Sequence, residues 1–105
     1  MQKLKLDELN RVNIETFKAQ EKLPIVVVLD NIRSMNNIGS IFRTADGFAV
    51  EHIYLCGITA QPPHREIEKT ALGATQSIDW TYFEHISTAI AQLKAQDYQI
   101  IAIEQ

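Results

Sequence analysis

Short apolar runs alternate with amphipathic segments along most of this chain. Four runs predict β-strands, because each is rich in β-branched or aromatic residues and is bounded by turn residues: 25–29, 52–56, 77–83 and 98–103. Three segments predict helices, because their apolar side chains recur at helical spacing: 36–47, 64–72 and 85–95. This alternation of strands and helices predicts an α/β fold, an open parallel sheet with helices on both faces.

The first and last predicted strands are apolar on both faces. Such strands are typical of the middle of a parallel sheet that helices cover on both sides. The sequence stops two residues after Ile103, without a helix to cover the last strand. We therefore expect residues 24–105 to be the N-terminal part of a longer domain, with residues 1–23 as a helical extension. The alternative is a small sheet covered by a dimer partner.

The composition narrows the class of protein. An apolar fraction of 46% over 105 residues is typical of one globular domain. Cys56 is the single cysteine, which excludes an internal disulfide and fits a reducing cytoplasm. No apolar run approaches membrane-spanning length, so we expect a cytoplasmic protein with no membrane partner. The net charge of −3 gives no support by itself for binding nucleic acid.

Several common functional motifs are absent from the sequence. No G-x-G-x-x-G follows a strand and no P-loop occurs, which counts against dinucleotide and P-loop nucleotide binding. His52, His64 and His85 have no ligand spacing, so no metal site is expected. Cys56 ends a predicted strand and is interpreted as a small buried apolar side chain.

Polar residues gather after the first predicted strand. Arg33, Asn36, Asn37 and Arg43 follow its carboxyl end, and Glu104 follows the last strand. The binding crevice of an open parallel sheet lies at the carboxyl ends of its strands, so this placement fits a site. A helix N-terminus favours anions, and arginine offers phosphate a planar bidentate fork. Asn37 and Arg43 therefore fit a phosphate-binding pair, in which Arg43 stabilises an alkoxide that develops on an attacking hydroxyl.

A structural interpretation of the same residues stays open. In it, one of the two asparagines caps the helix. Gly39 lets the helix pack closely on the sheet, and Arg43 pairs with Asp46 or lies against Glu51.

The residues around Arg43 also follow a recognisable pattern. The segment DNIRSMNNIGSIFRTADGFAVEHIYL contains N-x-G-x-x-x-R-T-A, which is met by Asn37, Gly39, Arg43, Thr44 and Ala45. The segment HREIEKTALGA follows downstream. Together they resemble the first motif and a later segment of the SpoU (TrmH-like) RNA methyltransferases, in the SPOUT superfamily. The resemblance runs from about residue 24 to the end.

The resemblance implies methyl transfer from S-adenosylmethionine to a ribose 2′-hydroxyl of tRNA or rRNA, by a homodimer with an α/β-knot fold. It implies that Arg43 is catalytic, that Asn37 supports it and the substrate phosphate, and that Glu104 lies at the cofactor pocket's edge. From their place after the first strand, Arg33 and Asn36 are expected to contact the RNA as well. The family's second and third motifs build the knot and most of that pocket, and neither is present. We therefore expect a partial SPOUT fold without the knot and an incomplete cofactor site.

Two other functions remain open. The chain would then be a non-catalytic RNA-binding or dimerisation module on the same scaffold, or an unrelated small-molecule-binding α/β domain in which Arg43 is structural.

Overall fold

The computed structural model describes residues 22–103. The helical extension predicted for residues 1–23 therefore lies outside the described residues, except for Lys22 and for Leu23, where the first strand begins. The elements in chain order are β1 (Leu23–Asp30), α2 (Met35–Gly47), β2 (Val50–Cys56), α3 (Arg65–Ala71), α4 (Ala74–Ser77), β3 (Asp79–Phe83) and α5 (Ile86–Ala95).

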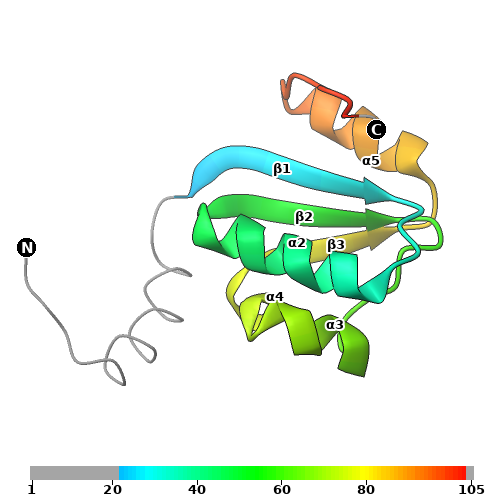
Figure 1. Ribbon diagram of the computed structural model, residues 1–105. Coiled ribbons are helices and arrows are strands. Elements are labelled where there is room, and N and C mark those ends of the chain that lie inside the picture. The colour runs from blue at the N-terminus through cyan, green and yellow to red at the C-terminus, as the bar shows by residue number, and fades with distance from the viewer. Residues whose placement is uncertain (1–21, 104–105) are drawn as a thin grey trace, which may run out of the picture.

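The strands form one parallel sheet in the order β1-β2-β3 (Figure 1). Val27 pairs with Ile53, and Ile53 pairs in turn with Trp80. Each crossover between neighbouring strands contains a helix, as parallel pairing requires. The predicted α/β fold with an open parallel sheet is confirmed.

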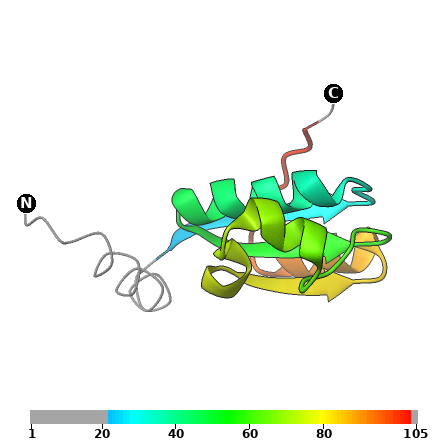
Figure 2. The same cartoon turned by 60° about the horizontal axis from the view of Figure 1, so that its bottom comes forward.

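Helices cover both faces of this sheet. Along β2, Ile53 and Leu55 are buried against α2, α3 and α4, whereas Tyr54 and Cys56 are buried against α5. Figure 2 shows the two layers, with α5 on the side of the sheet opposite to α2 and α3. The prediction of helices on both faces is therefore confirmed, and Cys56 is a buried apolar side chain as predicted.

Two predictions about the sheet are wrong. Residues 98–103 form no strand, and Ile103 is 93% exposed. Consequently β1 lies at an edge of the sheet rather than in its middle, and Ile25 is 49% exposed. Residues 98–103 have a high β-propensity. A strand forms, however, only where another strand pairs with it and other elements bury its apolar side chains. No element in the described range covers residues 98–103 from outside.

The segment after α5 is instead fixed by contacts at its beginning. The Tyr98 backbone N–H donates to the Leu93 carbonyl oxygen at 3.0 Å, which ends the helix. The Tyr98 hydroxyl donates to Glu51 Oε2 at 2.6 Å. This hydrogen bond to a carboxylate raises the pKa of Tyr98 above its ordinary value.

A close contact at Gly39 sets the position of α3 against α2. A Cβ on Gly39 would collide with Thr70 Oγ1 and with the Ile67 carbonyl oxygen, both on α3. Thr70 Oγ1 also donates to the Asn36 carbonyl oxygen at 3.0 Å across the same junction. The sequence suggested that Gly39 packs on the sheet, whereas the structure shows that its close neighbour is α3.

We expect Gly39→Ala to destabilise the protein. The new methyl group forces α3 away from α2, and overpacking of this kind costs about 1–3 kcal/mol. Urea denaturation followed by circular dichroism measures the loss. Gly47→Ala is the matched control, because a Cβ there meets nothing within 4 Å. It should be neutral or stabilising by up to about 1 kcal/mol. Equal stability of Gly39→Ala and wild type would contradict the expectation.

Candidate functional site

The loops at the carboxyl edge of the sheet are joined through buried Thr59. Its hydroxyl donates to the Leu29 carbonyl oxygen at 3.2 Å and accepts from the Ile32 backbone N–H at 3.0 Å. Nearby, Asn31 Oδ1 accepts from the Ile58 backbone N–H at 3.0 Å. These bonds tie the loop after β2 to the loop after β1. They thereby fix the loop from which α2 begins.

The first turn of α2 is capped by Ser34. Its Oγ accepts from the Asn37 backbone N–H at 3.1 Å. The prediction that Asn36 or Asn37 caps this helix is therefore wrong, since both lie inside the first turn. Because Ser34 supplies the cap, the side chains of both asparagines are left for other contacts.

Arg43 borders a hollow between α2 and α3. This α2–α3 hollow has a volume of about 610 Å³. Its lining consists of Ser40, Arg43, Thr44, Gly47, Phe48, Lys69, Thr70 and Leu72. The lining contains two cationic side chains and no acidic one. It is therefore suited to an anion.

The structural alternative for Arg43 required an acidic neighbour. Glu51, one of the two acidic partners considered for Arg43, is bonded to another residue. Glu51 accepts from the Tyr98 hydroxyl instead. The exposed Arg43 guanidinium is thus available for a ligand, as a permanently charged group.

Asn37 borders a different hollow, on the other side of α2. This β1–α2 hollow has a volume of about 510 Å³ and is mainly apolar. Its lining consists of Leu23, Ile25, Val27, Asn37, Ser40, Ile41, Thr44, Ala45, Phe48 and Val50. Ser40, Thr44 and Phe48 line both hollows. The structure therefore places Asn37 and Arg43 on adjoining sides of α2, about 9 Å apart along its axis.

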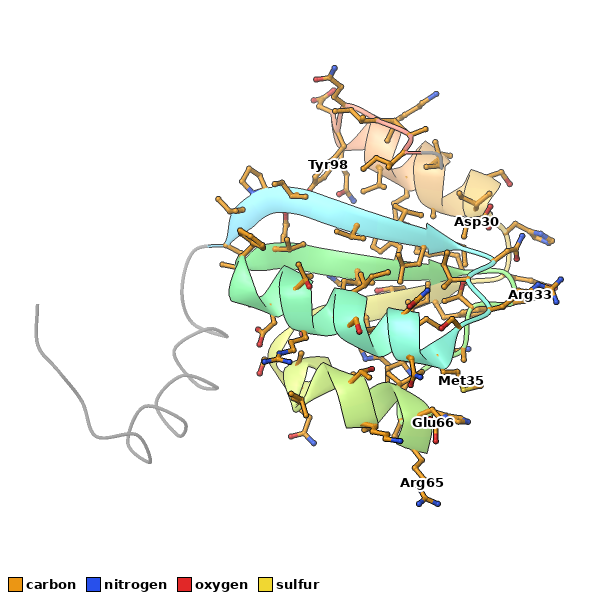
Figure 3. The ribbon with its side chains drawn as sticks, viewed as in Figure 1. Asp30, Arg33, Met35, Arg65, Glu66 and Tyr98 are labelled. Atoms are coloured by element: carbon orange, nitrogen blue, oxygen red, sulfur yellow. The ribbon has the colours of Figure 1, made fainter. Side chains whose placement is uncertain are left out.

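Arg33 and Asn36 lie nearer the carboxyl edge of the sheet than Arg43 does. Arg33 is exposed in the loop before α2 and extends from the carboxyl edge of the sheet (Figure 3). Asn36 stands seven positions before Arg43, so the two lie on nearly the same face of α2, about two turns apart. Glu104 lies outside the described residues. The structure brings Asn36 and Arg43 to one helix face and leaves Arg33 at the edge.

The described residues do not form a complete site for S-adenosylmethionine. A pocket for that cofactor needs polar partners for its adenine, ribose and amino-acid groups. The β1–α2 hollow offers only Asn37, Ser40 and Thr44 as polar side chains, without an acidic or basic one. The α2–α3 hollow presents two cations and no acidic side chain to a cofactor that itself carries a positive sulfonium and an ammonium group. Neither hollow fits the cofactor.

Metal and thiol chemistry are equally unsupported in this part of the chain. The described residues contain no cluster of three or more potential metal ligands. His64 caps α3 instead, where its Nδ1 accepts from the Glu66 backbone N–H at 3.1 Å. Burial, with a smaller effect of the Asp30 charge, raises the pKa of Cys56. A buried thiol with a raised pKa is a poor nucleophile.

No helix of residues 22–103 has the length and apolarity to cross a bilayer.

Sequence reasoning missed three residues that matter here: Thr59, Lys69 and Phe48. Thr59 gave no signal, because one polar residue in a proline-containing loop looks exposed. Lys69 and Phe48 lie on different elements and meet only through the packing of α2 on α3. Of the three residues, only Lys69 could have been found from the sequence, because helical periodicity places it on the polar side of the predicted helix 64–72.

Comparisons with known proteins give one consistent family. The model for the SpoU rRNA Methylase family matches residues 24–105. A Staphylococcus saprophyticus protein, assigned by name to the TrmH family of tRNA/rRNA methyltransferases, is 32% identical over 83% of this chain and 35% of its own length. The 23S rRNA (guanosine-2'-O-)-methyltransferase RlmB of Vibrio parahaemolyticus is 26% identical over 85% of this chain and 36% of its own length. The chain thus spans little more than a third of these relatives.

Two solved structures share the fold. One is a Porphyromonas gingivalis protein assigned to the TrmH family of RNA methyltransferases, with a TM-score of 0.62 and 25% identity. The match covers 73% of this chain and 32% of that one. The other is the SpoU methyltransferase AviRb of Streptomyces viridochromogenes, in complex with the cofactor AdoMet, with a TM-score of 0.65 and 20% identity. It covers 92% of this chain and 33% of that one, and at this identity it supports the fold alone.

We expect Thr59→Val to destabilise the protein although the side chain keeps its shape. The substitution leaves the Ile32 N–H and one lone pair on the Leu29 oxygen without the hydroxyl, at a cost of about 1–3 kcal/mol. Thr59→Ser keeps the hydroxyl and should lose less. Denaturation in urea compares the three proteins, and a valine variant as stable as wild type would refute the role of this hydroxyl.

Proposed function

The chain belongs to the SpoU rRNA Methylase family, and on this premise we propose that the complete protein is an RNA 2′-O-ribose methyltransferase. It would transfer a methyl group from S-adenosylmethionine to a ribose 2′-hydroxyl of tRNA or rRNA. One observation carries the proposal to particular residues: Arg43 stands exposed on a hollow that has no acidic lining. Its charge is therefore directed at a ligand rather than neutralised within the protein.

Arg43 acts as a cation in this proposal. Arginine side chains stay protonated in proteins at neutral pH, so the guanidinium is not a free base. In its charged form it binds a substrate phosphate through its planar fork and stabilises the alkoxide that develops on the 2′-oxygen. A phosphate oxygen held beside the hydroxyl accepts the proton. Asn37 supports the substrate from the adjoining side of α2, and Arg33 and Asn36 contact the RNA nearer the sheet edge.

S-adenosylmethionine supplies the methyl group when it is bound. AviRb, which shares this fold, was crystallised with that cofactor. Since the described residues do not form the pocket, most of the cofactor contacts would come from elsewhere in the complete protein, with Glu104 at their edge. We further propose that the working enzyme is a cytoplasmic homodimer that needs no metal.

We expect Arg43→Ala to abolish methyl transfer while the fold persists. The assay uses protein expressed from the complete gene, tritiated S-adenosylmethionine, and total tRNA and rRNA as substrates. Loss of the charge that stabilises the alkoxide should lower the rate by about 100-fold or more. Because Arg43 is exposed, the thermal midpoint should stay near that of wild type.

Arg65→Ala is the matched control, since Arg65 is exposed at the start of α3 and does not line either hollow. It should keep the wild-type rate. Full activity of Arg43→Ala would refute the catalytic role of Arg43. Intact RNA binding by a wild-type protein that transfers no methyl group to any RNA would instead favour a non-catalytic RNA-binding module.

We expect the 105-residue chain alone to bind no S-adenosylmethionine. Isothermal titration calorimetry of the folded chain should give only the heat of dilution, because neither hollow offers the polar groups that the cofactor needs. Saturable binding would contradict this and would show that these residues contain a cofactor pocket.

A further inference from the structure

The α2–α3 hollow contains a second cation that the proposed mechanism does not use. Lys69 is exposed and lines this hollow together with Arg43. The two side chains come from different helices, and the close contact at Gly39 holds those helices together. The two cationic side chains therefore line one hollow before a ligand binds, which lowers the entropic cost of binding a polyanion.

An exposed aromatic ring borders the same hollow. Phe48 follows the last residue of α2 and is 69% exposed. Leu72, at the end of α3, is 64% exposed on the same lining. A phenylalanine that is mostly in water gains little by packing, whereas its face can stack on a flat ligand. Cationic side chains beside an exposed ring are the combination that binds single-stranded nucleic acid.

We propose that the α2–α3 hollow is a subsite for a single-stranded segment of the RNA substrate. Lys69 binds a backbone phosphate adjacent to the one at Arg43, and an unpaired base stacks on Phe48. This inference rests on the proposed function, since that function supplies the RNA. It adds two residues that position the substrate, and it specifies a strand with a splayed base rather than a continuous duplex.

The exposed ring of Phe48 is the reason for proposing unpaired RNA rather than a duplex. A base inside a double helix is stacked on both faces and cannot lie on Phe48, so an aromatic contact requires a loop, a bulge or an end. Lys69 and Arg43 supply the electrostatic attraction that phosphate binding needs, in a protein whose net charge is −3. The subsite is thus a local cationic patch on an otherwise acidic protein.

Salt dependence separates the two proposed contacts. Fluorescence anisotropy with a fluorescein-labelled 12-nucleotide oligouridylate measures the Kd of the complete protein and of its variants between 50 and 200 mM KCl. Lys69→Gln should weaken binding and reduce the slope of log Kd against log salt by about 0.7, because one phosphate contact is lost. Phe48→Leu should weaken binding by about 5-fold or more with the slope unchanged, because stacking does not release counterions. Phe48→Trp should keep wild-type affinity.

Two substitutions elsewhere are the controls. Lys94→Gln removes an exposed lysine from α5, on the other side of the sheet, and Ile58→Ala removes an exposed apolar side chain from the carboxyl edge. Neither should change Kd or the slope. Equal effects of Lys69→Gln and Lys94→Gln, or no effect of Phe48→Leu, would overturn the subsite. So would failure of the wild-type protein to bind the oligonucleotide at 50 mM KCl.

The competing occupant of this hollow is a second copy of the chain. Sedimentation equilibrium tests it: a dimer that Phe48→Leu dissociates, with RNA affinity unchanged, would overturn the subsite in favour of an interface. The proposed function fails independently, if wild-type protein binds RNA with the expected slopes but transfers no methyl group. The subsite fails alone if Arg43→Ala abolishes transfer while Lys69→Gln and Phe48→Leu bind RNA as wild type does.

Discussion

The contact of Gly39 with α3 is the constraint on which the arrangement of the candidate site depends. With no side chain at this position, the backbone of α2 comes against Thr70 and Ile67 of α3. One turn later on α2, Arg43 therefore lines the same hollow as Lys69 of α3. The buried side chains Ile38 and Phe42 hold the same helix on the sheet. The close approach at Gly39 thus lets cationic side chains from two helices line one hollow.

The two faces of the sheet differ in what they present to solvent. On one face, α2 and α3 present charged and aromatic groups to solvent and bury a larger apolar cluster beneath them. On the other, α5 covers the smaller cluster around Tyr54 and Cys56 and presents neither hollow. Hydrogen bonds through Thr59 join the loops after β1 and β2, which lead into α2 and α3. Rigid support beneath an exposed site is the usual arrangement for substrate binding, since loops positioned by a scaffold carry function.

Sequence periodicity predicted the main architecture, and two motifs carried the resemblance, but neither predicted the neighbours of each residue. The alternation of runs correctly predicted three strands, three of the helices and burial of Cys56. It failed for residues 98–103, because β propensity does not say whether a pairing strand and a cover are present. It could not predict that Arg43 and Lys69 line one hollow, because that depends on how α2 packs on α3. It also could not assign the N-cap of α2 to Ser34, because that depends on the backbone geometry of the first turn. The helical spacing of Phe48 with Phe42 and Ala45 predicts burial, whereas Phe48 is 69% exposed.

The free edge of β1 has a consequence for handling this chain. No strand of residues 22–103 pairs with that edge, and the apolar side chains of the β1–α2 hollow run beside it. Pro24 lacks a donor, and the register slips between Leu23 and Val26, so only the first part of the edge is blunted. From Val26 to Asp30 the edge is regular and offers a template for intermolecular β-pairing. Concentrated solutions would therefore lose protein to edge-driven aggregation, and added charge along β1 would slow that loss.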